Sequence, residues 1–205
     1  GNSLHGAGGE WRVEQQRLRW DILDRFADAA EQAGIPKVDD FNGGNNIGVG
    51  RFEVNQRRGF RWNASKAFLR PVQHRRNLTV MTGAMIDRVM FEDGRATGIE
   101  FLRDGERCTV QAGIETILAA GSIGSPAILQ RSGVGPGDLL QHHGIPVVRD
   151  LPGVGANLQD HLQLRNIFKV RGIRTLNQIA NSWTGKLQMG LEYALFRSGP
   201  LSMAP

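Results

Sequence analysis

The chain has 205 residues with a mass of 22.5 kDa, 40% hydrophobic and 22% charged, enough for one domain with a core or for parts of two. Its single cysteine, Cys108, excludes an internal disulfide framework and any metal site built from several cysteines. The formal net charge is +5, but acidic residues occur throughout. We therefore expect a solvated surface, or steering of a phosphate-bearing cofactor, and no nucleic-acid partner.

Apolar residues at helical spacing predict a helix over residues 18–33, ended by Gly34 and Pro36. A short helix is expected over residues 64–69. The next part of the chain alternates between short apolar runs and polar turns, and the turn pairs Asp93-Gly94 and Asp104-Gly105 are typical of tight hairpins. We expect an antiparallel meander with a final returning strand, over residues 78–82, 85–91, 96–102, 108–112 and 115–118.

The segment 116–135 predicts a short apolar strand, a small-residue turn at Gly121 and a helix that opens at Ser125-Pro126. Such a strand–turn–helix brings backbone N–H groups close to a bound phosphate or ribose, although alone it is equally compatible with a purely structural turn. The rest of the sequence predicts further helices and strands. We expect helices over residues 125–130 and 137–142, strands over residues 145–148 and 164–170, and one or two helices over residues 178–196.

Several chemistries find no support in the sequence. No Gly-x-Ser-x-Gly motif occurs, which argues against a hydrolase. No pair of histidines has metal-ligand spacing, so we expect no metal site. The Gly6–Gly9 cluster has the wrong spacing for a Gly-x-Gly-x-x-Gly pyrophosphate loop and follows no apolar strand. His161 follows Asp160 and so has the sequence context of an oriented base.

Motifs along nearly the whole chain resemble the glucose–methanol–choline (GMC) family of flavin-dependent alcohol oxidoreductases. They lie at residues 5–11, 40–43, 59–61, 67–69, 76–80, 119–135 and 153–161. The segments 174–177 and 190–200 are similar to the choline dehydrogenase or primary-alcohol dehydrogenase branch. One departure is Asn63, where family members usually have Ser. The resemblance implies an α/β (mixed α+β) fold that is part of a two-dinucleotide-binding-domain flavoprotein with a small antiparallel meander.

The resemblance also implies FAD and its contacts. Ile86 would lie against the adenine and offer backbone hydrogen bonds, as well as being an ordinary buried strand residue. The backbone of Ala120 and Gly121 would pass close to the ribose–pyrophosphate. Residues 1–162 would be the central part of the FAD-binding domain, with interleaved substrate-side loops, and residues 163–205 the truncated beginning of a substrate-binding domain.

The family reaction oxidises a primary alcohol such as choline to the aldehyde, with hydride transfer to flavin N5 and electrons passing to a quinone or another carrier. The family's catalytic His lies near the C-terminus, beyond residue 205, so we expect no catalytic residue in this chain, His161 included. The chain does not begin with Met, and we expect an internal fragment that is inactive alone. No apolar run reaches the roughly 20 residues of a membrane span. We expect a cytoplasmic location, with peripheral association at the inner membrane as the alternative.

Two other functions stay open. The basic clusters at residues 57–61 and 74–76 suggest an independent binding module for nucleic acid or anionic lipid. A flavin alcohol oxidase that uses O₂ directly is the second, because the groups that select the electron acceptor lie outside this chain.

Overall fold

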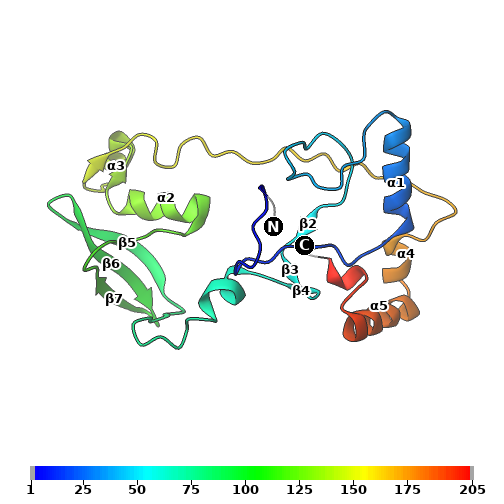
Figure 1. Cartoon of the computed structure of the whole chain (residues 1–205). Coiled ribbons are helices and arrows are strands. Elements are labelled where there is room, and N and C mark those ends of the chain that lie inside the picture. Colours follow the sequence, from blue (N-terminus) through cyan, green and yellow to red (C-terminus); the bar gives the residue numbers. More distant parts are fainter. Residues whose placement is uncertain (1–2, 204–205) are drawn as a thin grey trace. The chain divides into compact units, whose positions relative to one another are not determined.

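The computed structural model describes residues 3–203 and divides the chain into two compact units (Figure 1). Residues 80–166 form the meander unit. Residues 3–79 together with 167–203 form the second, which we call the terminal unit. Helices and strands are mixed in both, as expected from the sequence.

The meander unit is built on a three-stranded antiparallel sheet of β5 (Met85–Glu92), β6 (Arg95–Arg103) and β7 (Glu106–Gln111), in that order. The Asp-Gly turns form as predicted. Asp93 and Gly94 have φ of 49° and 77°, and Asp104 and Gly105 have 52° and 85°. Positive φ at both central residues matches the twist of the adjoining strands. The meander is therefore encoded largely by its turns.

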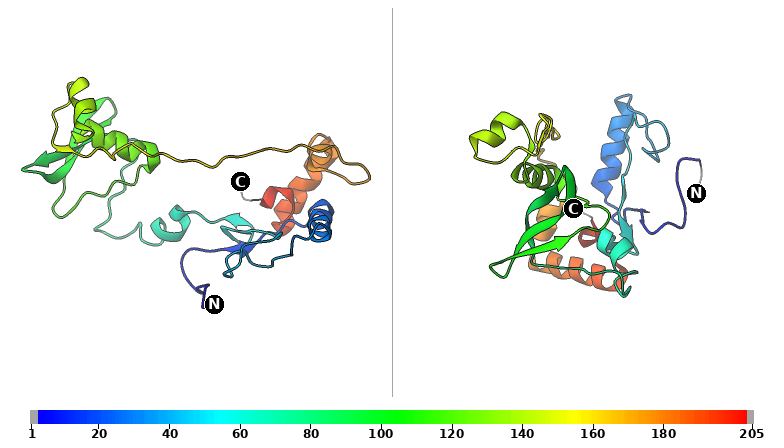
Figure 2. Two further views of the ribbon diagram at one scale, coloured as in Figure 1. Left: turned by 90° about the horizontal axis from the view of Figure 1, so that it is seen from above. Right: turned by 90° about the vertical axis from the view of Figure 1, so that its left-hand side faces the viewer.

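Helix α2 (Gly121–Arg131) packs beside β5, and α3 (Gly137–His142) follows it (Figure 2). Between them, β8 (Val134–Gly135) pairs in parallel with β9 (Arg149–Asp150). The backbone N–H of Gly137 donates to Asp150 Oδ1 at 2.9 Å, which satisfies one free donor at the start of α3. Buried side chains from the sheet, α2, β8 and α3 form the core of this unit, namely Val89, Phe101, Ile128, Val134 and Leu140.

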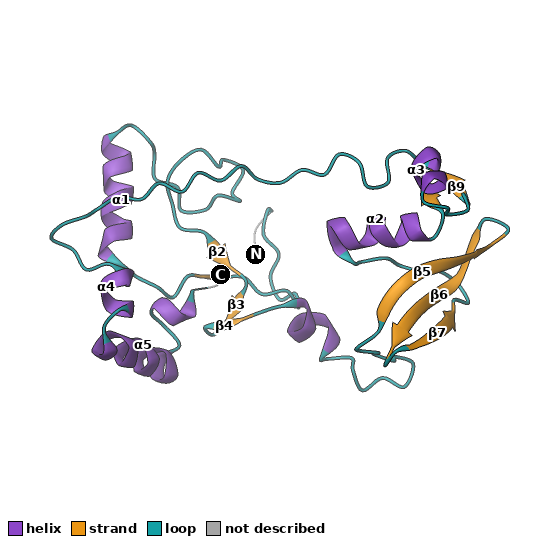
Figure 3. Cartoon of the chain, turned by 180° about the vertical axis from the view of Figure 1, so that it is seen from behind, coloured by secondary structure: helices purple, strands orange, loops and turns teal. Residues whose placement is uncertain are grey.

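Four expected strands do not form where predicted. Residues 78–82, 115–118 and 164–170 have no regular structure (Figure 3), and the pairing expected at 145–148 occurs instead at β9. A strand needs a partner for its backbone groups, and within residues 3–203 none reaches these three segments. Ile117 and Ile167, in two of these segments, are accordingly 77% and 93% exposed. The helix expected at residues 125–130 begins earlier, at Gly121.

The terminal unit combines helices with two small antiparallel ribbons. Helix α1 spans Asp21–Gln32, three residues shorter at its start than expected, and Asp21 and Asp24 in its first turn complement the helix dipole. The ribbons pair β1 (Glu14–Gln15) with β2 (Glu53–Val54) and β3 (Gln56–Arg57) with β4 (Phe60–Arg61). The remaining elements are the π-helical turn η1 (Ser65–Leu69), α4 (Leu176–Ala180), α5 (Trp183–Phe196) and the 3₁₀ turn η2 (Pro200–Ser202).

Within the terminal unit, the C-terminal helix docks on the turn between β3 and β4. The hydroxyl of Tyr193 donates to the carbonyl of Gly59 at 3.3 Å. The guanidinium of Arg197 lies 4.7 Å from the ring centre of Phe60, and the buried Gln56 amide donates to the carbonyl of Ser202. These contacts join segments more than 130 positions apart in the sequence.

Candidate cofactor site

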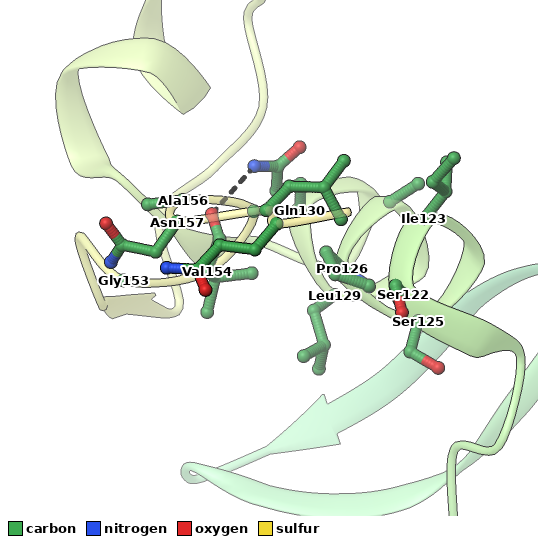
Figure 4. A pocket seen from close by; sticks show the side chains of 14 residues that line it. Ser122, Ile123, Ser125, Pro126, Leu129, Gln130, Gly153, Val154, Ala156 and Asn157 are labelled. Carbon is green, nitrogen blue, oxygen red and sulfur yellow. Dashed lines mark hydrogen bonds between the residues drawn. The ribbon is translucent and has the colours of Figure 1, made fainter. Parts of the chain in front are cut away.

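The meander unit contains a groove of about 630 Å³ between α2 and the loop that follows β9 (Figure 4). Both walls are rich in small residues, which lets a ligand approach the backbone closely. The α2 wall consists of Ser122, Ile123, Ser125, Pro126, Ala127, Leu129 and Gln130. The loop wall consists of residues 153–159.

A side-chain amide holds the loop against the helix. Gln130 Nε2 donates to the carbonyl of Val154 at 3.0 Å, the contact drawn as a dashed line in Figure 4. The next residue, Gly155, has φ of +82°, and a Cβ built there would lie 2.7 Å from Gln130 Nε2. Glycine is therefore favoured at position 155 by its backbone conformation, and a Cβ there would displace the Gln130 amide from its place.

The start of α2 is open and free of acidic side chains in its first turn. Gly121 has φ of +81°, and a Cβ built there would meet nothing within 4 Å. The backbone N–H of Ala120 donates to Ser125 Oγ at 2.9 Å, which fixes the turn before the helix. Ala120 and Gly121 are exposed. Because the first N–H groups of a helix carry partial positive charge, this turn fits a phosphate group, as the pyrophosphate of FAD requires.

Ile86 lies elsewhere in the same unit, on β5. Its carbonyl accepts a hydrogen bond from Arg131 Nη2 at 3.2 Å, and its side chain is half-buried. Arg131 ends α2 and Gly121 begins it, about 15 Å away along the helix axis. The structure thus divides the three predicted cofactor residues between two elements. Ala120 and Gly121 lie at the start of α2, and Ile86 lies on β5, bonded to the residue that ends α2.

None of Ile86, Ala120 and Gly121 lines the groove. Gln130 could not be identified from the sequence, because its contact with Val154 spans 24 positions. The glycines at 153 and 155 are typical of a tight turn, but they do not indicate what the turn packs against. The groove and the two ends of α2 together make up the candidate cofactor site.

Charged groups surround Asp87, next to Ile86 on β5. The carboxylate lies within 3.4 Å of the guanidinium groups of Arg88, Arg107 and Arg131. Partial burial acts to raise the pKa of Asp87, but the hydrogen bond with Arg88 and the charges of all three arginines outweigh it. The pKa of Asp87 therefore lies below its ordinary value.

His161 does not have the geometry of a base oriented by Asp160. Asp160 Oδ1 accepts a hydrogen bond from the backbone N–H of His161 at 2.8 Å, so the carboxylate is engaged with the main chain, and both residues are exposed. Among residues 3–203, no group of three or more His, Cys, Asp and Glu side chains is placed to hold a metal ion. In that same part of the chain, no helix is long and apolar enough to cross a membrane.

In the terminal unit, two segments that carry the family resemblance meet. His5 Nε2 lies 2.6 Å from Asp40 Oδ2, and this hydrogen bond, with help from the N–H of Asn42, lowers the pKa of Asp40.

Asn63, the position that departs from the family pattern, caps a helical turn. Asn63 Oδ1 accepts from the N–H of Lys66 at 3.0 Å, so it caps η1. Ser and Asn are both good caps, which explains why Asn63 can stand where family members usually have Ser.

The basic cluster at residues 57–61 makes contacts within the terminal unit. The guanidinium of Arg57 lies 5.1 Å from the ring centre of Trp62, and the backbone N–H of Arg58 donates to the carboxylate of Glu14 at 2.8 Å. The aromatic ring beside this cluster is thus already stacked by a cation of the same chain. This arrangement offers little support for a nucleic-acid surface.

Curated relatives match nearly the whole chain. Oxygen-dependent choline dehydrogenases from Pectobacterium carotovorum subsp. carotovorum and Burkholderia cenocepacia are 39% and 38% identical over 200 residues, 97% of this chain. The matched region is 36% and 35% of their respective lengths. The chain therefore spans about a third of the length of these relatives.

Solved structures agree in fold. An FAD-dependent oxidoreductase from Chaetomium thermophilum matches with a TM-score of 0.85 and 27% identity, over 98% of this chain and 36% of that one. A fungal aryl-alcohol oxidase matches with a TM-score of 0.82 and 28% identity, over 96% and 34%. The sequence profile of the GMC oxidoreductase family matches residues 10–163. The chain belongs to the GMC oxidoreductase family.

Proposed function

We propose that this chain forms one wall of the FAD site in a GMC enzyme that oxidises a primary alcohol, such as choline, to the aldehyde. The observation that carries the proposal is its similarity to oxygen-dependent choline dehydrogenases over 97% of its length. The open, non-acidic start of α2 supports it, because it offers backbone N–H groups to a phosphate.

Three residues are proposed as FAD contacts. Ala120 and Gly121 would lie beside the ribose–pyrophosphate, and the backbone of Ile86 would bind the adenine. When bound, FAD supplies the hydride acceptor, and the residues of this chain bind and orient it. We assign no catalytic base to this chain, and His161 is not proposed as one.

We also propose an electron acceptor, a location and a domain boundary for the complete enzyme that contains this chain. Electrons would pass to a quinone or another carrier, and the location would be cytoplasmic or peripheral at the inner membrane. The domain boundary between residues 162 and 163 also stays a prediction. A second candidate is an enzyme that passes electrons to O₂, which is favoured by the names of the choline dehydrogenase relatives and of the aryl-alcohol oxidase.

Expression of the complete reading frame that contains this chain tests the proposal. The expected result is a purified protein with flavin absorbance that is bleached by choline or another primary alcohol under anaerobic conditions. Reoxidation by O₂ compared with a quinone analogue distinguishes the two acceptors. Absence of flavin, or a flavin that no primary alcohol reduces, would contradict the proposal.

Residues 1–205 expressed alone should bind FAD weakly and show no alcohol turnover. Stoichiometric flavin together with turnover by this chain alone would show that its own residues complete the site. It would also contradict the assignment of no catalytic base to this chain.

A further inference from the structure

We propose that Arg131 is a positioning residue for the adenine end of the FAD site. It holds the peptide of Ile86 at a fixed distance from the Ala120–Gly121 turn. This inference rests on the proposed function, because it concerns the same cofactor. It assigns Arg131 no contact with the cofactor itself.

Arg131 binds two successive carbonyl groups on the free edge of β5. Its Nε donates to the carbonyl of Asp87 at 2.8 Å and its Nη2 to that of Ile86 at 3.2 Å. In a regular strand, successive carbonyls point to opposite sides. Here the register shifts, since Ile86 faces Phe101 while Arg88 faces Glu100, so Asp87 is the extra residue of a bulge. The bulge lets both carbonyls reach one guanidinium.

Only arginine has donors arranged to make this contact. The planar guanidinium presents Nε and Nη2 side by side, whereas the ammonium group of lysine is a single point of charge. Arg131 Nε also lies 3.4 Å from the carboxylate of Asp87. The three contacts fix the Ile86 peptide more firmly than one hydrogen bond would. Because Ile86 is proposed to bind adenine through its backbone, the orientation of that peptide decides the fit of the cofactor.

Other groups hold α2 on the sheet independently of Arg131. Ser132 Oγ accepts from the buried N–H of Val89 at 2.8 Å and donates to the carbonyl of Ile128 at 2.6 Å. Val89 and Ile128 are themselves core residues. The side chain of Arg131, by contrast, is 44% exposed. Its removal should therefore change the position of the Ile86 peptide without unfolding the unit.

Helix α2 links the Ile86 peptide to the other proposed cofactor contact, the Ala120–Gly121 turn. Arg131 is the last residue of α2 and Gly121 the first. An α-helix resists stretching because each added residue has a fixed rise of 1.5 Å. Arg131 thus ties the adenine-side strand to one end of a rigid element whose other end carries the proposed pyrophosphate turn.

The test compares the whole polypeptide encoded by this reading frame with its Arg131→Gln and Arg131→Lys variants. Arg107→Gln is the matched control, because Arg107 reaches the same Asp87 carboxylate at 3.4 Å from β7. The apoproteins are titrated with FAD and with two probes that represent its halves. ADP carries the adenine and pyrophosphate, and FMN carries the flavin without adenine. Thermal unfolding of each apoprotein is recorded as the stability control.

We expect Arg131→Gln to raise the dissociation constants of ADP and FAD about tenfold, because the Ile86 peptide would no longer be held in its binding orientation before the ligand arrives. FMN binding and the unfolding temperature should stay unchanged. Arg131→Lys should restore part of the affinity, and Arg107→Gln should bind like wild type.

Equal affinity of wild type and Arg131→Gln for ADP would overturn the inference. Equal weakening of ADP and FMN, or a large fall in unfolding temperature, would also overturn it by showing a general structural role. A wild-type protein that binds no FAD would instead overturn the proposed function.

Discussion

The side-chain amide of Gln130 is joined to the main chain of Val154 by a hydrogen bond of 3.0 Å. This bond connects the penultimate residue of α2 to the loop that forms the opposite wall of the groove. The groove therefore depends on a contact between side chain and backbone, and the backbone must leave room for it. Gly155 provides that room.

Gly155→Ala should destabilise the meander unit by about 1–2 kcal/mol, because a residue with Cβ is strained in the left-handed conformation. The new methyl group would also lie 2.7 Å from Gln130 Nε2, so the Gln130 side chain would have to move and lose its bond to Val154. Urea unfolding measures the free energy, and hydrogen exchange of residues 153–157 reports the loop. Gly153→Ala is the matched control, since a Cβ there meets nothing within 4 Å. Equal effects of the two variants would contradict the prediction.

Gly121→Ala should weaken FAD binding about 5- to 30-fold, because relief of the strain of about 1–2 kcal/mol at its φ of +81° would move the turn out of the conformation that binds the cofactor. Any steric contact of the new methyl group with the cofactor would add to this loss. Flavin fluorescence titration of the complete polypeptide gives the dissociation constant. Gly113→Ala, where a Cβ also meets nothing, should bind FAD like wild type. Unchanged affinity of Gly121→Ala would remove Gly121 from the proposed cofactor contacts.

Ser132→Ala should lower the free energy of unfolding by about 1–3 kcal/mol, because it leaves the buried N–H of Val89 without its acceptor. Ser125→Ala provides a comparison of the same chemical change. Ser125 Oγ accepts from the N–H of Ala120, which is exposed and can bond to water instead, so its loss should cost less. Urea denaturation of both variants decides the order, and a larger effect at Ser125 would refute the argument from burial.

Asp87 should make stability depend on pH below about pH 4. Its pKa is lower in the folded chain than the ordinary value of 3.8, so the unfolded chain takes up a proton first as the pH falls. The contribution is present above the unfolded pKa and is lost as the pH falls through the folded pKa. Asp87→Asn should flatten this part of a plot of unfolding free energy against pH. Asp104→Asn, at an exposed turn, should keep the wild-type slope, and identical curves for all three proteins would exclude the role of Asp87.

His161→Ala should leave kcat for alcohol oxidation within about twofold of wild type, because Asp160 binds the backbone of His161 and does not orient its ring. Removal of a true general base costs about 100-fold or more. Steady-state kinetics on the complete polypeptide measures this. A loss of that size, with the flavin content unchanged, would make His161 a catalytic residue.

Local features of the sequence predicted the elements whose structure is locally determined. The two Asp-Gly turns set the meander, because their backbone requires positive φ at both residues. Helix α3 has the expected bounds, residues 137–142, since the chain leaves it through a glycine at 144. The start of α2 was wrong by four residues. Pro126 suggested a first turn there, whereas the helix already begins at Gly121 and contains the proline.

Features that depend on distant partners could not be predicted. The apolar run at residues 115–118 looks like a strand, but pairing is a property of two segments, and within residues 3–203 no second segment reaches it. The contacts of Arg131 with Ile86 and Asp87 span 45 and 44 positions. Nothing in the residue types near Arg131 indicates a bulge in a strand that far away. The groove was missed for the same reason.

The last residue of α2 and its two neighbours in sequence form hydrogen bonds with three different partners. Gln130 reaches the loop, Arg131 the bulge carbonyls and Ser132 the N–H of Val89. Successive helical residues are turned by about 100°, so three adjacent positions can face three directions. One residue inserted or deleted between Gly121 and Gln130 would rotate all three by about 100° relative to the turn at Gly121, so the turn and the three partners could not all keep their places. Evolution can therefore exchange side chains along α2 far more freely than it can change the number of residues in the helix.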